Sequence, residues 1–404
     1  MSAAPRTRAG GPVPLPVHAA LDAASALALV AVPLWRGWPG RLRLALAAAG
    51  AGVAAYSLAT RYRPGARGAL TFDQHRLLDA AQGAAFGLAA AVVDAPREAR
   101  LAMAGYGAVS LAAAALTRGE GGPGTLPLPA GAVMRPATRS RARPVAPDVA
   151  WCKLGIVNVV FLGPEGAGDR GWVLVDAGLP GSAGAIAAAA AERFGRGARP
   201  AAIVMTHGHF DHVGALAALA GRWDAAVHTH PLERPHLDGS RAYPPGDPTV
   251  GGGTMAALSP LYPTAPVDLG DRLRDLPADG RVPGAPGWRW IHTPGHAPGH
   301  VSLWREGDRT LVAGDAVVTT AQESAWAALT QPPGLHGPPA YFTTDWPAAA
   351  ASVRRLAALR PDLVVAGHGR PVRGPELRRA LDRLAAGFDR IAVPAGGRYV
   401  RRGG

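Results

Sequence analysis

Three histidines and one aspartate stand within six consecutive residues, His-Gly-His-Phe-Asp-His. The apolar run 202–205 precedes them, so we expect a buried strand that ends in a loop carrying these side chains. A glycine separates His207 from His209, which lets both imidazoles face one metal ion, while Asp211 and His212 can face a second ion. Neutral imidazole and carboxylate are ligands that zinc and similar divalent ions prefer. The segment therefore predicts a metal site rather than a polar loop with incidental histidines.

Four further candidate ligands follow other apolar runs. Each run is short and rich in strand-forming residues, so we expect a strand followed by a loop that carries the ligand. Ligands carried on loops at one edge of a rigid sheet suit a preorganised metal site. The four residues are Asp176 after run 172–175, His296 after run 288–291, Asp315 after run 310–313 and His368 after run 363–366.

These motifs, in this order, resemble those of the metallo-β-lactamase-fold hydrolase superfamily, and the resemblance covers about residues 135–392. It implies an α/β fold, a four-layer αβ/βα sandwich with a dinuclear metal site at the edge of its sheets. It also implies a role for each residue. His207, His209 and His296 would hold one metal, Asp211, His212 and His368 the second, Asp315 would bridge both, and Asp176 would orient a ligand histidine by hydrogen bonding.

The chemistry that this resemblance implies is hydrolysis. Two zinc ions about 3.5–4 Å apart, with iron or manganese as alternatives, lower the pKa of a shared water and supply a bridging hydroxide near neutral pH. Asp211 and Asp315 would take part in catalysis as metal ligands. The expected substrate is a small molecule with an ester, thioester or lactone bond. The single cysteine, Cys152, is expected to be a buried apolar residue and does not match the cysteine ligand of some zinc β-lactamases.

Two other functions stay open. A mononuclear iron persulfide dioxygenase uses an overlapping ligand set, and iron content together with oxygen uptake would identify it. A non-catalytic membrane sensor or scaffold is the second alternative. The complete ligand set argues against it, because a degenerate site should have lost at least one ligand.

Two long segments are expected to cover the metal site. Residues 231–286 are rich in proline and glycine, and residues 319–346 follow the bridging aspartate. His336 and Tyr341, in the second segment, are candidate substrate contacts.

The composition favours a soluble surface and a membrane face over nucleic-acid binding. The chain has 404 residues, enough for two or three domains, and a net charge of +13. Its arginines are spread along the whole sequence without an aromatic-interleaved basic patch, so we expect no nucleic-acid partner. One cysteine excludes an intrachain disulfide and fits a reducing compartment.

The first 118 residues contain an internal duplication with a spacing of 57 residues, for example His18 and Asp22 recurring as His75 and Asp79. The two copies span about 18–61 and 75–118, and each reads as two apolar helices. The expected helical runs are 19–35, 44–60, 77–93 and 101–117.

These four runs favour a four-span membrane domain over a soluble bundle. Each has about 17 residues, the lower limit of the ~17–25 needed to cross a bilayer, and hardly any polar residue forms a stripe at helical period. The membrane would then be contacted through residues 19–117. Arginines are more numerous on the side of the domain's two ends, which predicts a bacterial inner-membrane protein with its hydrolase in the cytoplasm. A soluble cytoplasmic protein is the alternative.

The histidine–aspartate pairs His18/Asp22 and His75/Asp79 are spaced i, i+4, so each pair can meet on one helix face. A haem, metal or proton-relay site between the two copies is one interpretation. We favour the other, a polar pair that caps each helix or joins the bundle. Beyond this domain we expect a Gly-, Pro- and Arg-rich linker over 119–145, the hydrolase domain over 146–392 and a basic tail over 393–404.

Overall fold

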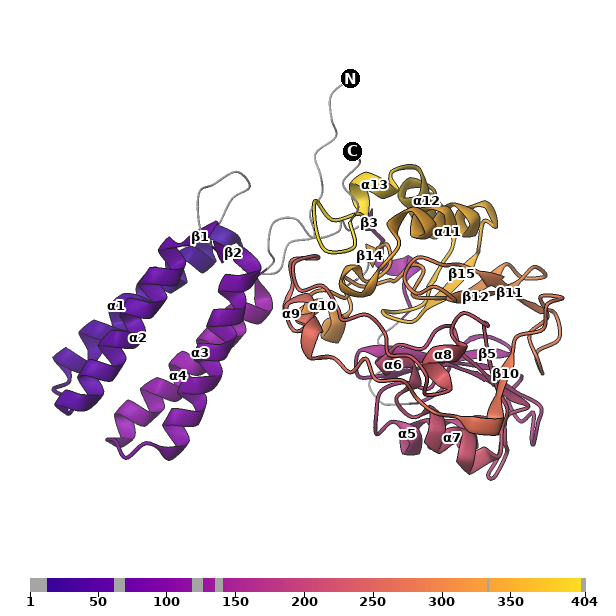
Figure 1. The fold of residues 1–404 in the computed structure, drawn as a ribbon, viewed down its shortest axis with the longest axis horizontal. Coiled ribbons are helices and arrows are strands. Elements are labelled where there is room, and N and C mark those ends of the chain that lie inside the picture. Colours follow the sequence, from indigo (N-terminus) through magenta and orange to yellow (C-terminus); the bar gives the residue numbers. More distant parts are fainter. Residues whose placement is uncertain (1–12, 62–69, 118–125, 135–140, 333, 401–404) are drawn as a thin grey trace, which may run out of the picture.

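The computed structural model of the chain describes residues 13–61, 70–117, 126–134, 141–332 and 334–400. A helical N-terminal region, indigo to purple in Figure 1, stands beside a larger α/β region formed by the rest of the chain. Each region contains one cluster of histidines and aspartates.

The N-terminal region consists of two helical hairpins. Its helices are α1 (Leu15–Trp35), α2 (Gly40–Leu58), α3 (Phe72–Val92) and α4 (Arg97–Leu116). Helix α1 packs mainly against α2, and α3 packs mainly against α4. Pro39 and Pro96, which are repeat copies, occupy the N-caps of α2 and α4, and the fixed φ of proline suits the start of a helix. Two short strands, β1 (Thr60–Arg61) and β2 (Leu70–Thr71), pair in parallel where the hairpins meet.

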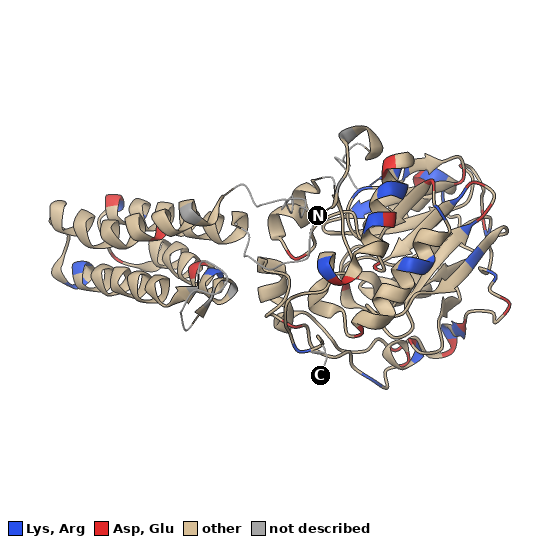
Figure 2. Cartoon of the chain, turned by 90° about the horizontal axis from the view of Figure 1, so that it is seen from above, with Lys and Arg blue, Asp and Glu red and all other residues tan. Residues whose placement is uncertain are grey.

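The helical region is apolar on its outside, and its interior holds a buried apolar cluster as well as a polar one. Of the eighteen large hydrophobic side chains exposed among the described residues, fifteen lie between Val17 and Leu111. The same helices carry few charged residues in Figure 2, whereas the α/β region carries many. Two of them, over Val17–Trp35 and Arg97–Leu116, are long and apolar enough to cross a membrane. This distribution is the reverse of a soluble bundle, which buries its apolar stripe.

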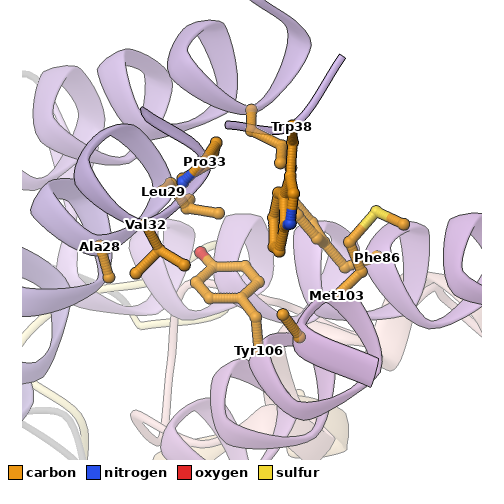
Figure 3. Close-up of a pocket in the computed structure, with 10 residues that line it drawn as sticks. Ala28, Leu29, Val32, Pro33, Trp38, Phe86, Met103 and Tyr106 are labelled. Atoms are coloured by element: carbon orange, nitrogen blue, oxygen red, sulfur yellow. The ribbon is translucent and has the colours of Figure 1, made fainter. Parts of the chain in front are cut away.

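An apolar pocket lies between the two hairpins, away from the strands β1 and β2 (Figure 3). Its lining includes Trp38 from the α1–α2 turn, Phe86 from α3 and Tyr106 from α4. Trp38 also donates from Nε1 to Glu98 Oε1 at 2.9 Å, and Arg36 forms an ion pair with the same carboxylate. The hairpins are therefore connected at this end by a mixed apolar and polar contact.

Two β-sheets form the centre of the α/β region. The strands of the first are β4 (Arg143–Ala146), β5 (Val149–Leu154), β6 (Val157–Leu162), β7 (Val173–Val175), β8 (Ala202–Val204), β9 (Val227–Thr229) and β10 (Leu273–Asp275), in the order β10-β9-β8-β7-β6-β5-β4. Those of the second are β11 (Trp288–His292), β12 (Val301–Arg305), β13 (Thr310–Gly314), β15 (Leu363–Ala366) and β16 (Val372–Arg373), in sequence order. Strands β7 to β10 are parallel neighbours, as are β13 and β15.

Helices cover the outer faces of both sheets. Helices α5 (Ala183–Phe194) and α7 (Leu216–Trp223) pack on the first sheet, and α11 (Trp346–Ala358) and α12 (Pro375–Ala386) pack on the second (Figure 1). Between the sheets, Trp151, Val204 and Leu303 belong to one buried core. Helix, sheet, sheet and helix therefore form four layers. The predicted α/β sandwich and the predicted four N-terminal helices are both confirmed.

Short elements complete the chain. They are the strands β3 (Leu126–Pro127) and β14 (Gly334–Leu335), the α-helices α6 (Phe210–Val213), α8 (Arg234–Leu237), α9 (Thr254–Ala257), α10 (Ala325–Thr330) and α13 (Phe388–Ile391), and the 3-10 helices η1 (Ala130–Ala132), η2 (Ser259–Leu261), η3 (Gly270–Arg272) and η4 (Ala340–Phe342). Strand β3, inside the segment expected to be a linker, pairs with β14, and β4 begins at Arg143. Residues 118–125 and 135–140 of that segment lie outside the described residues.

The two regions meet at Arg76 of α3. Its guanidinium donates to Gly252 O at 3.1 Å and to Thr254 Oγ1 at 2.5 Å on the α/β side. It also donates to Ala114 O of α4 at 2.8 Å, and Thr254 Oγ1 donates to the same carbonyl at 3.1 Å. Arg76 is 2% exposed, so these carbonyl and hydroxyl acceptors offset the cost of burying its charge.

Candidate metal centre

The predicted ligands lie where strands end. His207 and His209 follow β8, and Asp211 and His212 are on α6, the single helical turn that comes directly after them. Asp315 follows β13, and Gly367 and His368 follow β15. His296 stands in the turn between β11 and β12.

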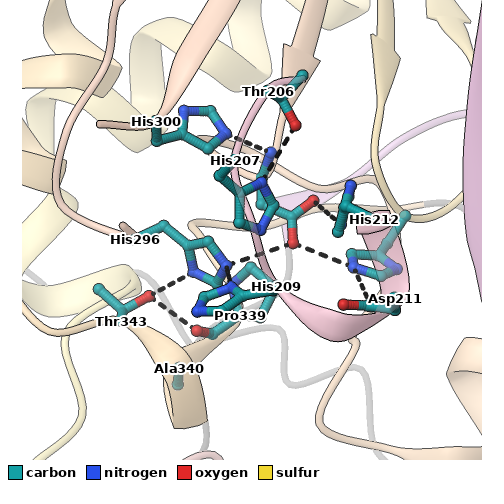
Figure 4. Close-up of polar contacts among 12 residues, drawn as sticks. Thr206, His207, His209, Asp211, His212, His296, His300, Pro339, Ala340 and Thr343 are labelled. Atoms are coloured by element: carbon teal, nitrogen blue, oxygen red, sulfur yellow. Dashed lines mark hydrogen bonds and ion pairs between the residues drawn. The ribbon is translucent and has the colours of Figure 1, made fainter. Parts of the chain in front are cut away.

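The structure brings all seven predicted ligands together. Three groups have their ligand atoms within 4.8 Å of one another, and every member is buried. The groups are His207, His209 and His296; His207, His212 and Asp315; and Asp211, His212 and His368. Figure 4 shows His207, His209 and His296 on one side and Asp211 and His212 on the other. The first and third groups are the two ligand triads that the sequence motifs implied.

Asp315 lies between these two triads. Its Oδ2 is 3.5 Å from His296 Nε2 and 3.0 Å from His368 Nε2, and its Oδ1 is 3.6 Å from His212 Nε2. On the first side, His209 Nδ1 is 3.0 Å from His296 Nε2. On the second side, His368 Nε2 is 3.4 Å from Asp211 Oδ2. One carboxylate therefore touches both groups, which is the geometry that a bridging ligand requires.

Space restricts the positions before His368 and Asp315 to glycine. A Cβ at Gly367 would lie 2.1 Å from Asp315 Oδ1, and a Cβ at Gly314, which has a φ of +54°, would lie 2.5 Å from His300 Nε2. Any larger residue would therefore displace the carboxylate or the backbone that carries it.

Asp176 determines the tautomers of two histidines. It follows β7 with a φ of 60°, a left-handed conformation that aspartate tolerates better than most residues. Its Oδ2 accepts hydrogen bonds from His212 Nδ1 and from Thr206 Oγ1, both at 2.8 Å. Because Thr206 gives its proton to Asp176, it must accept from His207 Nδ1, which is 3.1 Å away. The protonated Nδ1 atoms leave Nε2 of His207 and of His212 as lone-pair donors that face the cluster.

Two other histidines are oriented in the same way. His296 Nδ1 is 3.2 Å from Thr343 Oγ1, and this hydroxyl gives its own proton to Pro339 O at 2.7 Å (Figure 4). His368 Nδ1 donates to Ile156 O at 2.8 Å. In both rings the lone pair is then on Nε2, on the side of Asp315.

The cluster has ligand atoms without partners. His207 Nε2, His212 Nε2 and Asp315 Oδ1 are buried and have no hydrogen-bond partner among the residues that the structure describes. An unpaired buried polar atom costs about 1–3 kcal/mol, which a coordinated cation would remove. These atoms and the donor set of imidazole and carboxylate fit divalent metal ions.

The protonation of the first triad and of Asp315 also suits metal binding. Burial, with the neighbouring histidines, holds the pKa of His207 and of His209 well below the ordinary value. Burial lowers the pKa of His296 to about 3. Burial would raise the pKa of Asp315, but His368 and His212 outweigh it and hold that pKa well below the ordinary value. These three imidazoles are thus neutral and the carboxyl ionised at pH 7, the forms that bind metal.

Comparison with known protein families identifies the family of the α/β region. The profile of the family described as the Metallo-beta-lactamase superfamily matches residues 152–368, a span that includes all seven candidate ligands. The chain belongs to this superfamily.

Its relatives carry hydrolase names. Over 230 residues the chain is 46% identical to "Probable metallo-hydrolase YflN" of Bacillus subtilis (strain 168), covering 57% of this chain and 87% of that protein. It is 28% identical over 173 residues to "Probable metallo-hydrolase YybB" of the same strain, covering 43% of this chain and 66% of that protein. A solved structure, TTHA1623 in a di-iron-bound form, is 26% identical, covers 58% of this chain and 93% of that chain, and has a TM-score of 0.36.

Glu233 is a supporting residue of this superfamily domain that the sequence analysis missed. It is fully buried; its Oε2 accepts from Gly208 N at 3.0 Å, and its Oε1 accepts from Gly299 N at 2.7 Å. Tyr243 donates its hydroxyl proton to the same carboxylate. One side chain therefore holds the His207–His209 loop against the turn that carries His296. In the sequence, the one hint of this supporting role is that Glu233 follows two apolar residues, Pro231 and Leu232.

His300 is a second supporting residue of the metal centre. It is fully buried, and its Nε2 accepts from the backbone N–H of Asp315 at 2.8 Å. Its Nδ1 then carries the proton and donates to Thr293 Oγ1 at 2.9 Å. His300 thus fixes the backbone that carries the carboxylate. By contrast, His292 stacks on His230 with ring centroids 4.2 Å apart, outside the ligand groups.

Aromatic side chains lie beside the second triad. Phe210 and Tyr262 have ring centroids 5.3 Å apart, and Tyr262 is 6.0 Å from Tyr341. Burial, with Asp211, raises the pKa of Tyr262 and of Tyr341, so both phenols are neutral hydrogen-bond donors at pH 7. Tyr341 therefore lies near the cluster, as a substrate contact would. His336 is buried and its backbone pairs with Val318, so its proposed contact with substrate stays a prediction.

Proposed function

We propose that this chain is a dinuclear metal-dependent hydrolase that cleaves an ester, thioester or lactone. One divalent ion is held by His207, His209 and His296, the other by Asp211, His212 and His368, and Asp315 bridges them. Zinc is the metal best matched to this donor set, with iron or manganese as alternatives. The observation that carries the proposal is the position of Asp315, whose carboxylate touches both triads.

Bound at such a site, two divalent ions supply a hydroxide nucleophile at neutral pH and polarise the scissile carbonyl. The chain's own residues keep the site ready for this chemistry. Asp176, Thr343 and Ile156 hold the rings of His212, His296 and His368 through Nδ1, which directs Nε2 of each ring at the cluster. Glu233 keeps the two ligand loops in register.

The aromatic side chains indicate the kind of substrate. Phe210 and Tyr262 offer apolar faces beside Asp211, and Phe342 stacks on His209. The neutral phenol of Tyr341 can donate to a polar oxygen. An apolar acyl group next to the cleaved bond fits this wall, whereas a highly charged phosphodiester has no Lys or Arg among these residues to receive it.

The test begins with metal content. Purified full-length protein should contain two divalent ions at the α/β region and hydrolyse members of a panel of lactones, thioesters and aryl esters. Phosphodiesters serve as the negative panel. One iron per chain together with oxygen uptake on a persulfide would overturn the proposal in favour of a dioxygenase. Full metal occupancy without turnover on any substrate class would favour a sensor or scaffold.

We also propose that residues 19–117 anchor the enzyme in a membrane. The support is the outward-facing apolar surface of the four helices, which in water would be a large exposed patch. In cell fractionation the full chain should stay with the membrane after a carbonate wash and require detergent for release. Recovery in the soluble fraction would contradict the anchor without affecting the hydrolase.

A further inference from the structure

The two histidine–aspartate pairs of the duplicated helices converge on one point inside the helical region. His18 and Asp22 lie on α1, and His75 and Asp79 lie on α3. Each of the four has a ligand atom within 4.8 Å of the others, and none is more than 6% exposed. The cluster lies far in sequence from the hydrolase ligands and uses none of them.

We propose that His18, Asp22, His75 and Asp79 form a separate metal site, which holds one divalent transition-metal ion, best matched by zinc, and joins the two helical hairpins.

The spacing of the ligand atoms supports coordination. His18 Nε2 is 3.2 Å from His75 Nε2, 2.9 Å from Asp79 Oδ2 and 3.6 Å from Asp22 Oδ1. His75 Nε2 is 3.0 Å from Asp22 Oδ2 and 3.2 Å from Asp79 Oδ2. Zinc bonds to nitrogen and oxygen of about 2.0–2.2 Å in a tetrahedron place neighbouring ligands about 3.3–3.6 Å apart. The measured separations surround these values, so a small contraction or expansion of the cluster would seat the ion.

Hydrogen bonds behind the rings leave the right lone pair for a metal. His75 Nδ1 is 3.0 Å from Thr60 Oγ1, and Thr60 gives its own proton to Tyr56 O at 2.6 Å. Thr60 must therefore accept from His75 Nδ1, which leaves Nε2 directed at the cluster. His18 Nδ1 is 2.7 Å from Thr117 Oγ1. Thr60 and Thr117 are repeat copies, and each supports the histidine of the opposite copy.

The charge of the four side chains also favours a bound cation. With both imidazoles in the neutral form that binds metal, the two buried carboxylates would leave a net charge of −2, which a divalent cation neutralises. A metal-free network in which both Nε2 atoms carry a proton is disfavoured. It would point two N–H donors at each other across the 3.2 Å between the Nε2 atoms. The same separation leaves no room for a porphyrin between the rings, so the haem considered from the sequence does not fit.

The proposed ion has a structural role. All four positions of a tetrahedron would be filled by side chains, the closed arrangement typical of structural zinc. Each hairpin supplies one histidine and one aspartate, so the ion would connect α1 to α3 near the end where β1 and β2 pair. The sequence analysis favoured a joining role for these residues, and the geometry points to a metal as the means.

The test is metal stoichiometry of the detergent-solubilised full chain, dialysed against limiting free zinc. The double variant Asp22→Asn/Asp79→Asn keeps side-chain shape and should lose one zinc per chain relative to the parent. His228→Gln is the control, because His228 is outside both clusters and should leave the zinc content unchanged. The decrement of one does not depend on how many ions the hydrolase site holds, since Asp315→Ala removes those independently.

A gentler pair of variants covers the case in which the double variant fails to fold. Thr60→Val removes the acceptor behind His75 and should weaken the zinc affinity of this site about 10- to 100-fold, whereas Thr60→Ser should restore it. Competition with a zinc chelator measures the change. Equal zinc content and affinity in all variants would overturn the proposal and leave a metal-free buried network.

Discussion

His207 and His368 reach one cluster from loops at distant points of the hydrolase sequence, whereas His18 and Asp22 lie one turn apart on α1. The hydrolase centre is thus assembled by the sheets, through five separate strand ends. The helical cluster is assembled by an i, i+4 spacing that occurs twice because the region is duplicated. Both end as buried sets of imidazole and carboxylate.

The difference in assembly indicates a difference in role. In the hydrolase centre the ligands are unequal: Asp315 touches both triads, whereas the other candidate ligands each belong to one side. In the helical cluster the two halves supply the same ligand types, one histidine and one aspartate each, and Thr60 and Thr117 lie behind the rings. Unequal surroundings suit the handling of a substrate, while a closed and symmetric set suits a fixed connection between two hairpins.

The largest effect should come from removing the shared carboxylate. Asp315→Ala takes a ligand from both proposed ions, so turnover should fall at least about 1,000-fold. Metal content of the α/β region should fall with it, while circular dichroism and the zinc of the helical cluster stay unchanged. Asp308→Ala is the control, an exposed carboxylate in the β12–β13 turn. Turnover within a few-fold of the parent would refute the role given to Asp315.

A backbone substitution should be nearly as damaging. Gly367→Ala places a methyl group 2.1 Å from Asp315 Oδ1, so the carboxylate has to move out of the bridging position. We expect metal content to drop and turnover to fall about 100-fold or more, because small displacements of catalytic groups are costly. Gly307→Ala, where the new methyl has open space, is the matched control. A fully active Gly367→Ala would show that the bridge tolerates displacement.

The sequence predicted the ligands better than the residues that hold them. Ligand types recur after apolar runs, and that pattern is local, so Asp211, Asp315 and His368 could be read directly. Glu233 and Thr343 act across the fold, through Gly208, Gly299 and His296, and no local pattern records such contacts. The same limit applies to the helices. The i, i+4 pairs could be read, but the meeting of α1 with α3 could not.

Two of the N-terminal helices begin earlier than the sequence predicted. The runs expected at 44–60 and 101–117 were placed by apolar content, whereas α2 begins at Gly40 and α4 at Arg97. The prolines before them start the helices, and polar first turns then belong to the helix although they lack apolar residues.

A substitution of Glu233 should have an effect of intermediate size on the metal centre of the α/β region. Glu233→Gln keeps one acceptor oxygen but turns an N–H₂ group toward a glycine N–H, so one of the two loops loses its partner. Metal affinity should weaken about 10- to 100-fold, with turnover recovered at high zinc. Glu192→Gln, on an exposed ion pair with Arg141, should change neither quantity. An affinity equal to the parent would mean that the loops hold their register without this carboxylate.

The smallest expected effect concerns the aromatic side chains beside the second triad, Phe210, Tyr262 and Tyr341. Tyr262→Phe keeps the ring that packs on Phe210 and should leave KM for an apolar ester within about two-fold. Tyr262→Ala removes the ring, and the loss of about 1–2 kcal/mol of apolar contact should raise KM about 5- to 30-fold while metal content stays at the parent's level. The contrast between these two variants separates a binding wall from a structural one. A KM that rises equally in both would assign the phenol hydroxyl to substrate, and a loss of metal in Tyr262→Ala would make the wall part of the metal centre itself.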